Sequence, residues 1–565
     1  MSSMQHPLSY TSGTSAQPLI GLTIGAMLDH IAATYPDQDA LIVRHQDIRW
    51  TYHELLHEVN TCARALLAIG VQPGDRVGIW SHNCYQWTLI QLATAKIGAI
   101  LVNVNPSYRA HELEYALNQS ETRFLFTADN FKDTSYRAML NELAPELTNS
   151  APGQLSAARM PHLKGIVNFS TESFAGMQRW HDFMELAVQV DVSTVAKIQA
   201  GLSMDDPINI QYTSGTTGFP KGATLSHHNI LNNGYFVAES MGFTHQDRLV
   251  IPVPLYHCFG MVMGNLGCLT HGAAMIYPAE GFDAEAVLKT VHEERATALF
   301  GVPTMFVAEL EHPDFAHYDL TSLRTGIMAG SVCPAEIMRQ VTQRMHLTEI
   351  QIAYGMTETS PVSTQTSAQD PLEKRVTTVG RTQPHQETKI IDPASGQLVA
   401  RGEVGELCTR GYSVMLGYWN NDEATAECID AHGWMHSGDL ATMDEEGYVK
   451  IVGRIKDMVI RGGENIYPRE VEEFLYTHPA VSEVQITGVP DKKYGEELVA
   501  WVKFHPGITD VTAEDLRAFC KGKITHFKIP RYFKFVQEFP MTVTGKAQKF
   551  KMREISTREL GLEDV

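Results

Sequence analysis

The stretch Tyr212–Gly222 reads YTSGTTGFPKG, and its four hydroxyl side chains and three glycines surround a single lysine. Glycines let the backbone turn its N–H groups toward an anion, hydroxyls donate hydrogen bonds, and a lysine adds positive charge. The composition predicts a phosphate-binding loop, with a plain Ser/Thr/Gly surface loop as the alternative. The candidate phosphate ligands are Thr213, Ser214, Gly215, Thr216, Thr217, Gly218 and Lys221.

The order of residues in this loop differs from that of a Walker loop. It reads G-x-x-G-x-x-K-G and lacks the G-x-x-x-x-G-K-[ST] order that leads directly into a helix. The residues before it, Ile208–Gln211, are typical of a strand. The loop is therefore expected to follow a strand without belonging to the Walker class.

The surrounding sequence predicts an α/β fold. Strand and helix patterns alternate between residues 74 and 120, and another helix and strand follow the phosphate loop, which is typical of a parallel sheet. We expect a large N-terminal domain of doubly wound sheets over residues 21–452. The alternating elements between residues 74 and 120 are expected to be strand 76–80, helix 85–98, strand 99–104 and helix 110–118.

The C-terminal third has a different pattern. Beyond Thr377 the predicted strands are short and joined by Gly/Asp turns, which indicates a small β-barrel over about 375–452. A charged, glycine-rich run follows, so we place a domain boundary at 453 with a hinge near Lys456. Residues 453–565 alternate helix and strand and are expected to form a small, mobile α+β lid domain. At the other end, residues 1–20 are expected to be a poorly ordered arm.

Length, charge and cysteine usage limit the function classes. At 565 residues the chain exceeds one hydrophobic core, and a net charge of −20 argues against a nucleic-acid partner. Eight cysteines without a C-x-x-C pair favour a reducing compartment, and no targeting signal or membrane-spanning run is evident. The cytoplasm is therefore expected. The sequence leaves open whether the chain forms a homo-oligomer and whether it makes peripheral contact with lipid.

A zinc-protease pattern, HELLH at His53–His57, has a simpler interpretation. Thr51 followed three residues later by Glu54 is the capping box of a helix start. The further ligands that a zinc protease needs are missing from the expected positions. The segment is therefore predicted to be an ordinary capped helix.

A second chemical motif, YGMTET at Tyr354–Thr359, follows an apolar, strand-like run. Tyr354 offers an aromatic face to a base, Thr357 offers a hydroxyl to a phosphate, and Glu358 offers the hard oxygen that Mg²⁺ prefers. A strand-to-loop turn without chemistry is the alternative reading of so short a segment.

These two segments resemble signatures of the adenylate-forming enzymes, which include acyl-CoA synthetases, adenylation domains of peptide synthetases and luciferases. Six similar segments occur in the family's order between residues 212 and 546. The resemblance implies that the loop wraps the β- and γ-phosphates of ATP, that Thr357 contacts the α-phosphate, and that Glu358 binds magnesium.

The resemblance also gives roles to residues near the domain boundary. It implies that Asp439 accepts both ribose hydroxyls, although an aspartate in such a turn usually caps backbone N–H groups. It places a ribose-binding arginine at Arg454 and the pantetheine chain of coenzyme A near Gly462 and Gly463. It makes Lys546 the catalytic lysine of adenylation, whereas an exposed lysine on a polar turn would ordinarily have no role.

The acyl pocket is expected around the apolar segment 254–264. The resemblance makes His257 a gate at the pocket mouth, and Met261 could line an apolar tunnel, with core packing as the equal alternative. The resemblance also implies that two strand-ending segments, which contain Val302 and Gly330, run past the adenine and the acyl carboxylate. The candidate pocket residues are His257, Phe259, Gly260, Met261, Val302, Ala329 and Met356.

The sequence therefore predicts an ATP-dependent acyl-CoA synthetase that uses Mg²⁺ and coenzyme A. The segment 254–264 has no carboxylate for an amino group, which argues against an amino-acid substrate. Similarity to the medium-chain branch favours a medium-chain fatty acid, and aryl and branched or terpenoid acids stay open. A non-catalytic nucleotide-binding protein is the rival from a different class, and the combination of Glu358, Asp439 and Lys546 speaks against it.

Overall fold

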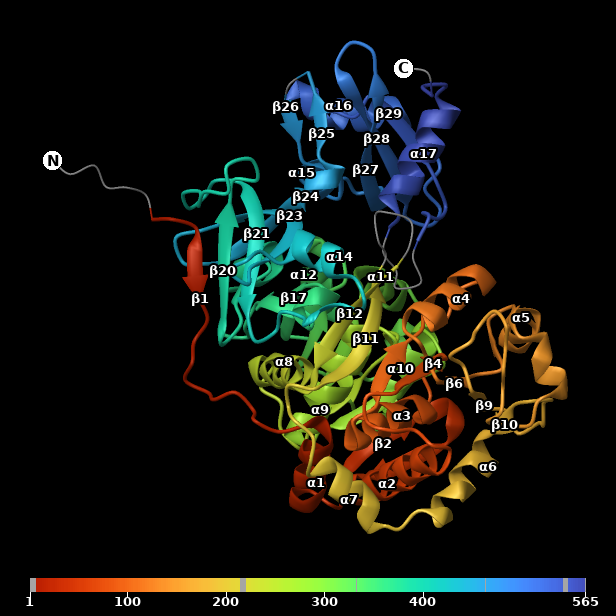
Figure 1. Cartoon of the computed structure of the whole chain (residues 1–565). Helices are drawn as coiled ribbons and strands as arrows, with labels where there is room; N and C mark the ends of the chain where they lie inside the picture. The colour runs from red at the N-terminus through yellow and green to blue at the C-terminus, as the bar shows by residue number, and fades with distance from the viewer. Residues whose placement is uncertain (1–6, 214–219, 332, 463, 542–546, 564–565) are drawn as a thin grey trace.

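The computed structural model describes residues 7–213, 220–331, 333–462, 464–541 and 547–563. Figure 1 shows a large body, which holds an eight-stranded and a nine-stranded sheet, and a smaller C-terminal part above it. A five-stranded sheet lies beside the body, near the C-terminal part. Parallel strands dominate both large sheets, so the α/β fold predicted from the sequence is confirmed.

The eight-stranded sheet carries the phosphate-loop hairpin. Its strand order is β10-β9-β6-β4-β5-β11-β12-β22, and β11 runs parallel to β5 but antiparallel to β12. The strands are β4 (Arg76–Trp80), β5 (Ile100–Asn103), β6 (Phe124–Thr127), β9 (Gly165–Asn168), β10 (Gln178–Arg179), β11 (Pro207–Thr213), β12 (Lys221–Ser226) and β22 (Gly417–Tyr418).

The nine-stranded sheet carries the YGMTET motif. Its order is β19-β18-β17-β16-β15-β13-β14-β2-β3, with parallel pairing from β17 to β2. The strands are β2 (Asp39–Val43), β3 (Ile48–Thr51), β13 (Arg248–Val250), β14 (Ala274–Tyr277), β15 (Ala298–Gly301), β16 (Thr325–Met328), β17 (Glu349–Gly355), β18 (Val362–Gln365) and β19 (Arg381–Thr382).

Helices cover and separate these sheets. Helix α3 is buried along almost its whole length, and its buried polar side chains have partners, such as the Met261 carbonyl oxygen for Gln91 and the Asp29 carboxylate for Lys96. The largest core joins it to β4 of one sheet and β2 of the other. The helices of this body are α1 (Ile24–Thr34), α2 (Tyr52–Ala68), α3 (Tyr85–Ile97), α4 (Ala110–Gln119), α5 (Tyr136–Leu143), α6 (Trp180–Glu185), α7 (Ser193–Gln199), α8 (His227–Ser240), α9 (Gly267–His271), α10 (Ala284–Glu294), α11 (Pro303–Leu310), α12 (Ala335–Arg344), α13 (Leu372–Thr377) and α14 (Asp422–Cys428).

The predicted capping box at the start of α2 is confirmed. The Thr51 hydroxyl accepts a hydrogen bond from the Glu54 N–H, and the Glu54 carboxylate accepts one from the Thr51 N–H. His53 and His57 lie on the exposed side of this helix. The HELLH pattern is therefore explained by the cap and by the amphipathic helix that follows it.

The short strands predicted beyond residue 377 form an antiparallel sheet of order β1-β20-β21-β23-β24. Its first strand differs from expectation, because residues 10–12 lie in the segment expected to be a poorly ordered arm. The ring of Tyr10 packs edge-on against Trp434 at 6.3 Å, and its hydroxyl donates to Glu387. The strands are β1 (Tyr10–Ser12), β20 (Gln386–Ile391), β21 (Gly405–Gly411), β23 (Met435–Met443) and β24 (Val449–Arg454).

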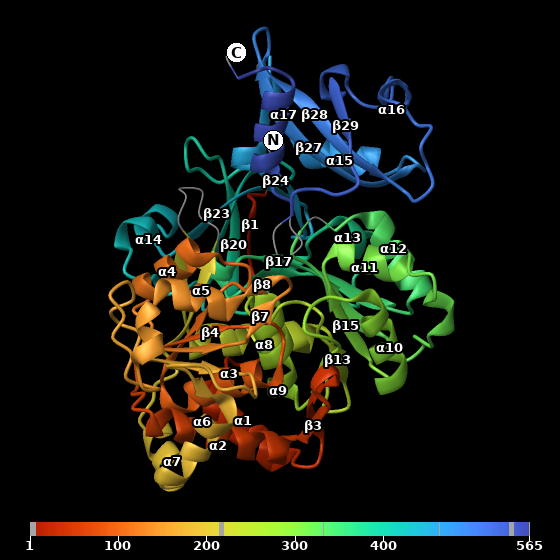
Figure 2. The same cartoon turned by 90° about the vertical axis from the view of Figure 1, so that its right-hand side faces the viewer.

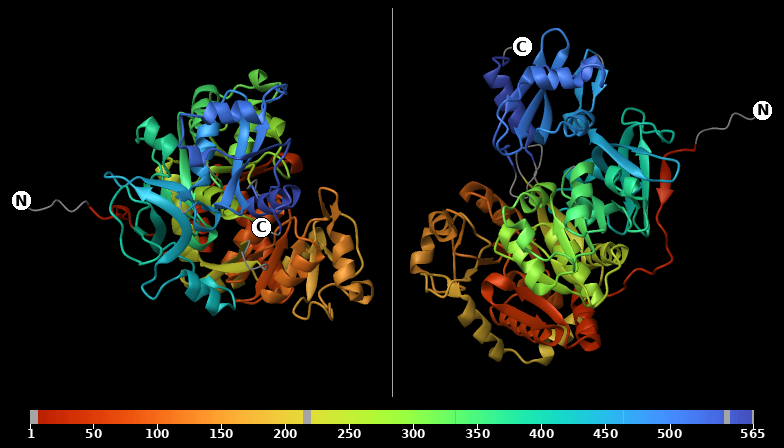
Figure 3. Two further views of the ribbon diagram at one scale, coloured as in Figure 1. Left: turned by 90° about the horizontal axis from the view of Figure 1, so that it is seen from above. Right: turned by 180° about the vertical axis from the view of Figure 1, so that it is seen from behind.

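The C-terminal α+β part has its own sheet and cores (Figures 2 and 3). Among the described residues, Glu473 pairs with Lys450 of the five-stranded sheet at 3.7 Å, and His505 pairs with Glu311 of the body at 3.1 Å. None of the described helices is long and apolar enough to cross a membrane. The C-terminal elements are β25 (Val459–Arg461), β26 (Glu464–Ile466), α15 (Pro468–Leu475), β27 (Val481–Asp491), β28 (Gly495–Phe504), α16 (Ala513–Cys520), β29 (Tyr532–Phe535) and α17 (Lys549–Glu559).

Candidate functional site

The hairpin β11–β12 places the two ends of the predicted phosphate loop side by side. Thr213 at the end of β11 pairs with Lys221 at the start of β12. The Thr213 hydroxyl lies 3.4 Å from the Lys221 carbonyl oxygen and 3.4 Å from Oε1 of Glu358. Five candidate ligands lie outside the described residues, namely Ser214, Gly215, Thr216, Thr217 and Gly218.

Glu358 lies in the 3-10 turn η6 (Thr357–Thr359), just beyond the end of β17. Its side chain is buried, and Oε1 accepts a hydrogen bond from the Tyr418 hydroxyl at 2.7 Å. Burial and the Glu358 carboxylate raise the pKa of the Tyr418 phenol, so Tyr418 stays a hydrogen-bond donor. Thr357, in the same turn, is also buried.

The surroundings of Glu358 fit a magnesium ligand. In the part of the chain that the structure describes, no Lys, Arg or His forms an ion pair with this carboxylate. A buried carboxylate is expensive unless a cation or a metal ion compensates its charge. Glu358 could therefore hold Mg²⁺, with the Thr213 hydroxyl as a neighbouring oxygen donor.

Lys221 lies over the ring of Tyr418. Its ammonium group is 5.2 Å from the centre of the Tyr418 ring and 3.9 Å from the carboxylate of the exposed residue Glu427. Because Glu427 is exposed, its ion pair with Lys221 is weak. Lys221 is therefore placed as a positive charge beside the Glu358 cluster.

A second cluster joins the YGMTET motif to the small sheet. The Tyr354 hydroxyl donates to Oδ2 of Asp439 at 2.6 Å, and Nε of Arg454 donates to Oδ1 at 3.1 Å. Asp439 in β23 and Arg454 in β24 face each other in the strand register. Burial and the Asp439 carboxylate raise the pKa of the Tyr354 phenol, which keeps it protonated.

The turn that carries Asp439 is held by a residue that the sequence analysis missed. Oε1 of Glu406 accepts a hydrogen bond from the Gly438 N–H at 3.0 Å, and its Oε2 lies 3.0 Å from Nδ1 of His436. Tyr418, the donor to Glu358, was also missed. Neither residue belongs to a local motif, and pairing of β21 with β23 and of β22 with β12 is what brings them to the site.

Gly330 and Val302 lie where two parallel strands of the nine-stranded sheet end. Gly330 has φ +90°, and a Cβ atom there would lie 3.1 Å from Cγ1 of Val302. Only glycine adopts this backbone conformation at low cost. Val302 and the neighbouring Ala329 are buried, and Met356, after β17, is partly exposed.

The candidate acyl segment forms a buried π-helix, η4 (Phe259–Leu266). A Cβ atom on Gly260 would lie 2.5 Å from the Pro254 carbonyl oxygen, so this helix requires glycine there. The thioether of Met261 is 1% exposed and accepts hydrogen bonds from the amides of Asn103 and Gln211. The segment is therefore locked by polar contacts on one side.

His257 and Phe259 lie at the start of this segment's π-helix. Nδ1 of the partly exposed His257 accepts a hydrogen bond from the Phe259 N–H at 3.2 Å. The buried ring of Phe259 packs against Phe300 at 5.1 Å. The His257 tautomer that accepts this bond carries its proton on Nε2.

The predicted hinge and coenzyme A residues follow β24. Lys456 lies in the short turn η7 (Ile455–Asp457), between the small sheet and the C-terminal sheet. The N–H of Gly462 donates to the Tyr494 carbonyl oxygen at 2.7 Å. Gly463 and the predicted catalytic Lys546 lie outside the described residues.

No cysteine near these clusters is set up as a nucleophile. Burial raises the pKa of Cys258, beside the candidate acyl segment, to about 12, and its thiol donates to Gln211. Burial likewise raises the pKa of Cys428, near Tyr418, to about 11. A thiol acts as a nucleophile only as its thiolate, so the chemistry of this site depends on positioning and charge.

Comparison with known proteins agrees with this arrangement. The family model described as "AMP-binding enzyme" matches residues 28–419, and that of the "AMP-binding enzyme C-terminal domain" matches residues 470–546. The chain is 52% identical over 536 residues to the protein named "Putative acyl-CoA synthetase YngI" from Bacillus subtilis (strain 168), covering 95% of this chain and 97% of that protein.

Two further matches come from a vertebrate enzyme and a solved structure. The chain is 44% identical to the medium-chain acyl-CoA ligase ACSF2 of Danio rerio, covering 98% of this chain and 91% of that one. The crystal structure of the anthranilate CoA ligase AuaEII with anthranoyl-AMP superimposes with a TM-score of 0.85 at 26% identity, covering 97% and 99% of the two chains. Together with the two clusters built around β11, β17 and β23, these matches place the chain in the AMP-binding enzyme family.

Proposed function

We propose that the chain is an AMP-forming acid–CoA ligase that activates a medium-chain fatty acid. The observation that carries this proposal is the pairing of two clusters at one site, Thr213–Glu358–Tyr418 and Tyr354–Asp439–Arg454. The first suits a metal-bound polyphosphate and the second suits a ribose. The curated relatives, both named as acyl-CoA synthetases or ligases, support the acid and the thiol as the other substrates.

The proposed reaction has two steps. First, a carboxylate oxygen of the acid attacks the α-phosphorus of ATP, and the bond to pyrophosphate breaks to leave an acyl-adenylate. Then the sulfur of coenzyme A attacks the acyl carbon, and the carbon–oxygen bond to AMP breaks. Such transfers depend mainly on positioning and on neutralising charge.

Each cluster has a role in this proposal. Mg²⁺ held by Glu358 would neutralise phosphate charge, and Thr357 and Lys221 would contact the phosphates. Asp439, oriented by Tyr354 and Arg454, would accept the ribose hydroxyls. By the family resemblance Lys546 would stabilise the charge that develops during adenylation.

The nature of the acid is inferred from the segment 254–264. It carries no acidic side chain, and its π-helix is buried and apolar except for contacts with polar amides. An apolar acyl chain suits such a surface better than a charged one. An aryl acid is the second candidate, because the superimposed ligase structure contains anthranoyl-AMP.

The lid movement and the compartment are part of the same proposal. We infer that the boundary at 453, with Lys456 as hinge, lets the C-terminal domain change position between the two steps and bring Gly462 and Gly463 to coenzyme A. The ion pairs Lys450–Glu473 and Glu311–His505, which link it to the rest of the described chain, are partly exposed and therefore easily exchanged. All eight cysteines are free thiols, which supports the cytoplasm.

A panel of acids tests the function. AMP formation is measured with ATP, Mg²⁺ and coenzyme A for straight-chain acids of increasing length, for aryl acids and for branched acids. We expect the highest kcat/KM for a medium-length straight chain. An aryl optimum would reassign the substrate, and pyrophosphate release that no acid stimulates would favour a non-catalytic nucleotide-binding protein.

The variant Lys546→Ala tests the division of the two steps. We expect it to lose adenylate formation from ATP and the acid but to keep thioester formation from a supplied acyl-adenylate. Lys551→Ala, at an exposed lysine five residues further on, is the matched control and should keep both steps. Equal loss of both steps in Lys546→Ala would contradict the proposed role.

A further inference from the structure

Three potential metal ligands, to which none of the motifs above gives a role, lie together at one edge of the body. His45 follows β2 in the turn η1 (Arg44–Gln46), His82 follows β4, and Glu280 follows β14. Strands β2 and β14 run parallel to each other and β4 runs parallel to β5, whereas β2 is antiparallel to its other neighbour, β3. The carboxyl ends of parallel strands are where open α/β sheets usually bind ligands.

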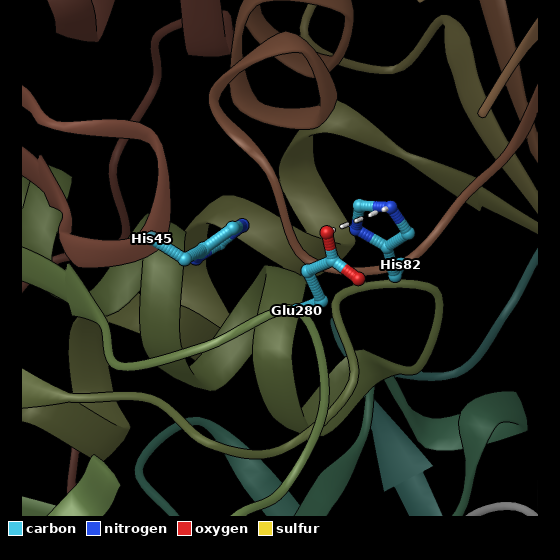
Figure 4. Close-up of side chains that lie close together, drawn as sticks. All are labelled: His45, His82 and Glu280. Atoms are coloured by element: carbon cyan, nitrogen blue, oxygen red, sulfur yellow. Dashed lines mark ion pairs between the residues drawn. The ribbon is translucent and has the colours of Figure 1, made fainter. Parts of the chain in front are cut away.

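The side chains converge on one point. Figure 4 shows the Glu280 carboxylate between the two imidazole rings. One ligand atom from each residue lies within 4.8 Å of the others, and Nε2 of His82 is 3.9 Å from Oε1 of Glu280. The His45 and His82 rings are 6.3 Å apart, edge to face.

The hydrogen bonding of His82 leaves its Nε2 atom, which faces Glu280, available to bind a metal ion. Nδ1 of His82 lies 3.2 Å from the Asn83 carbonyl oxygen, which can only accept, so Nδ1 carries the proton. In the neutral ring Nε2 then has a lone pair, and Nε2 is the atom that faces Glu280. Histidines that bind metals commonly donate their other N–H to a backbone carbonyl in this way.

The backbone of Asn83 also fixes the loop that carries Glu280. Its N–H donates to the Glu280 carbonyl oxygen at 3.0 Å, and its buried side chain bonds to the backbone of Val253 and Leu255. These contacts hold two of the three ligand segments at a fixed separation. A bound metal would therefore join the His45 segment to the His82 and Glu280 segments, which hydrogen bonds already hold together.

We propose that His45, His82 and Glu280 form a binding site for a divalent transition-metal ion, with Zn²⁺ as the preferred occupant. Two imidazoles and one carboxylate are ligands that Zn²⁺ accepts, with water in a fourth position, whereas Mg²⁺ prefers oxygen. Zinc bonds of about 2.0–2.1 Å place donor atoms about 3.3 Å apart. The Glu280 side chain is 65% exposed, so its rotation can close the remaining gap.

The second cluster of possible ligands, Glu406, Cys408 and His436, is a weaker candidate. Both carboxylate oxygens of Glu406 already serve the turn before Asp439. Burial raises the pKa of Cys408 to about 12, which opposes the thiolate that zinc requires. The cluster of Glu406, Cys408 and His436 therefore serves as an internal comparison in the experiment.

Isothermal titration calorimetry tests the proposal. The full-length chain is first treated with a chelator and then titrated with ZnCl₂. We expect one saturable site in the wild type and at least about tenfold weaker binding in His82→Ala and in Glu280→Gln. His181→Ala is the matched control, because His181 and Glu185 form an exposed pair at 3.2 Å for which the described residues supply no third ligand. It should bind as the wild type does.

Cobalt identifies the ligands directly. Co²⁺ bound at His45, His82 and Glu280 should give weak visible bands without a thiolate-to-cobalt charge-transfer band, and Glu280→Gln should remove them. Because Glu280 is exposed, this variant should fold normally, which circular dichroism checks. A charge-transfer band from Cys408, unchanged zinc binding in both variants, or no saturable binding by the wild type would each overturn the proposal.

Discussion

The ribose end and the phosphate end of the candidate nucleotide site are built in different ways. At the ribose end, Asp439 already has a phenol and a guanidinium as partners within the described structure. At the phosphate end, the buried Glu358 has two hydroxyl neighbours and no cationic partner in the same described part.

This difference indicates where the ligand must supply charge. A carboxylate with both oxygens oriented is ready to accept hydroxyl groups and needs nothing further. A buried carboxylate that has only hydroxyl partners keeps an uncompensated charge, which a bound metal ion would neutralise. We therefore expect substitutions at the phosphate end to affect turnover and those at the ribose end to affect nucleotide affinity.

The largest effect is expected from Glu358→Gln. The amide keeps the shape of the side chain but removes the charge that would hold Mg²⁺, so pyrophosphate release should fall about a hundredfold or more. Thermal stability should stay the same or rise, because an uncompensated buried charge is removed. The exposed Glu423→Gln on α14 is the control and should change neither quantity. Loss of stability in parallel with activity would contradict the metal role.

A smaller effect is expected from Asp439→Asn. The loss of a charged acceptor should raise the KM for ATP about 10–100-fold, since a hydrogen bond to a charged group contributes about 1.5–3 kcal/mol. The kcat should change less than the KM. Steady-state kinetics at varied ATP measure both values, with the exposed Asp422→Asn as control. A fall in kcat at unchanged KM would remove the distinction between the two ends.

Tyr418→Phe should have a modest effect at the phosphate end. It removes one hydrogen bond to Glu358, so activity should fall about three- to tenfold. The magnesium concentration that gives half-maximal activity should shift as well, because the carboxylate orientation changes. In the Glu358→Gln background the same substitution should add almost nothing, and additive losses would show that Tyr418 acts independently.

The smallest effect on activity is expected from substitution of Glu309, a buried glutamate of α11 that lies outside the site. Neither of its carboxylate oxygens has a hydrogen-bond partner among the described residues, and burial raises its pKa well above the usual range. The folded chain therefore holds a proton that the unfolded chain releases above the ordinary glutamate pKa. Its contribution is favourable at low pH and is lost as pH rises, by up to about 1.4 kcal/mol per pH unit.

Glu309→Gln should flatten this pH dependence without changing kcat. Urea unfolding at pH 5 and pH 8 measures it, and the gain in stability over the wild type should be larger at pH 8. Glu285→Gln, at an exposed glutamate of the neighbouring helix α10, is the control for charge. An equal change at both pH values would show that Glu309 is not protonated in the folded chain.

Local patterns in the sequence predicted much of the fold. The strand 76–80 and the helices starting at Tyr85 and Ala110 lie where the alternation of apolar and polar residues placed them. The edge strand Tyr10–Ser12 was missed, because its pairing with β20 joins residues more than 370 positions apart. A polar segment of three residues has no local signal that could reveal such a partner.

The sequence by itself determined the chemical groups of the site, because a phosphate loop and the YGMTET motif are contiguous and their residue types limit what they can bind. It also determined the α/β class, since strand and helix periods are local properties. Only the tertiary structure decided that Tyr418 contacts Glu358, that Glu406 holds the Asp439 turn, and that His45, His82 and Glu280 converge. These contacts depend on strand order and register, which arise from packing between segments far apart in the chain.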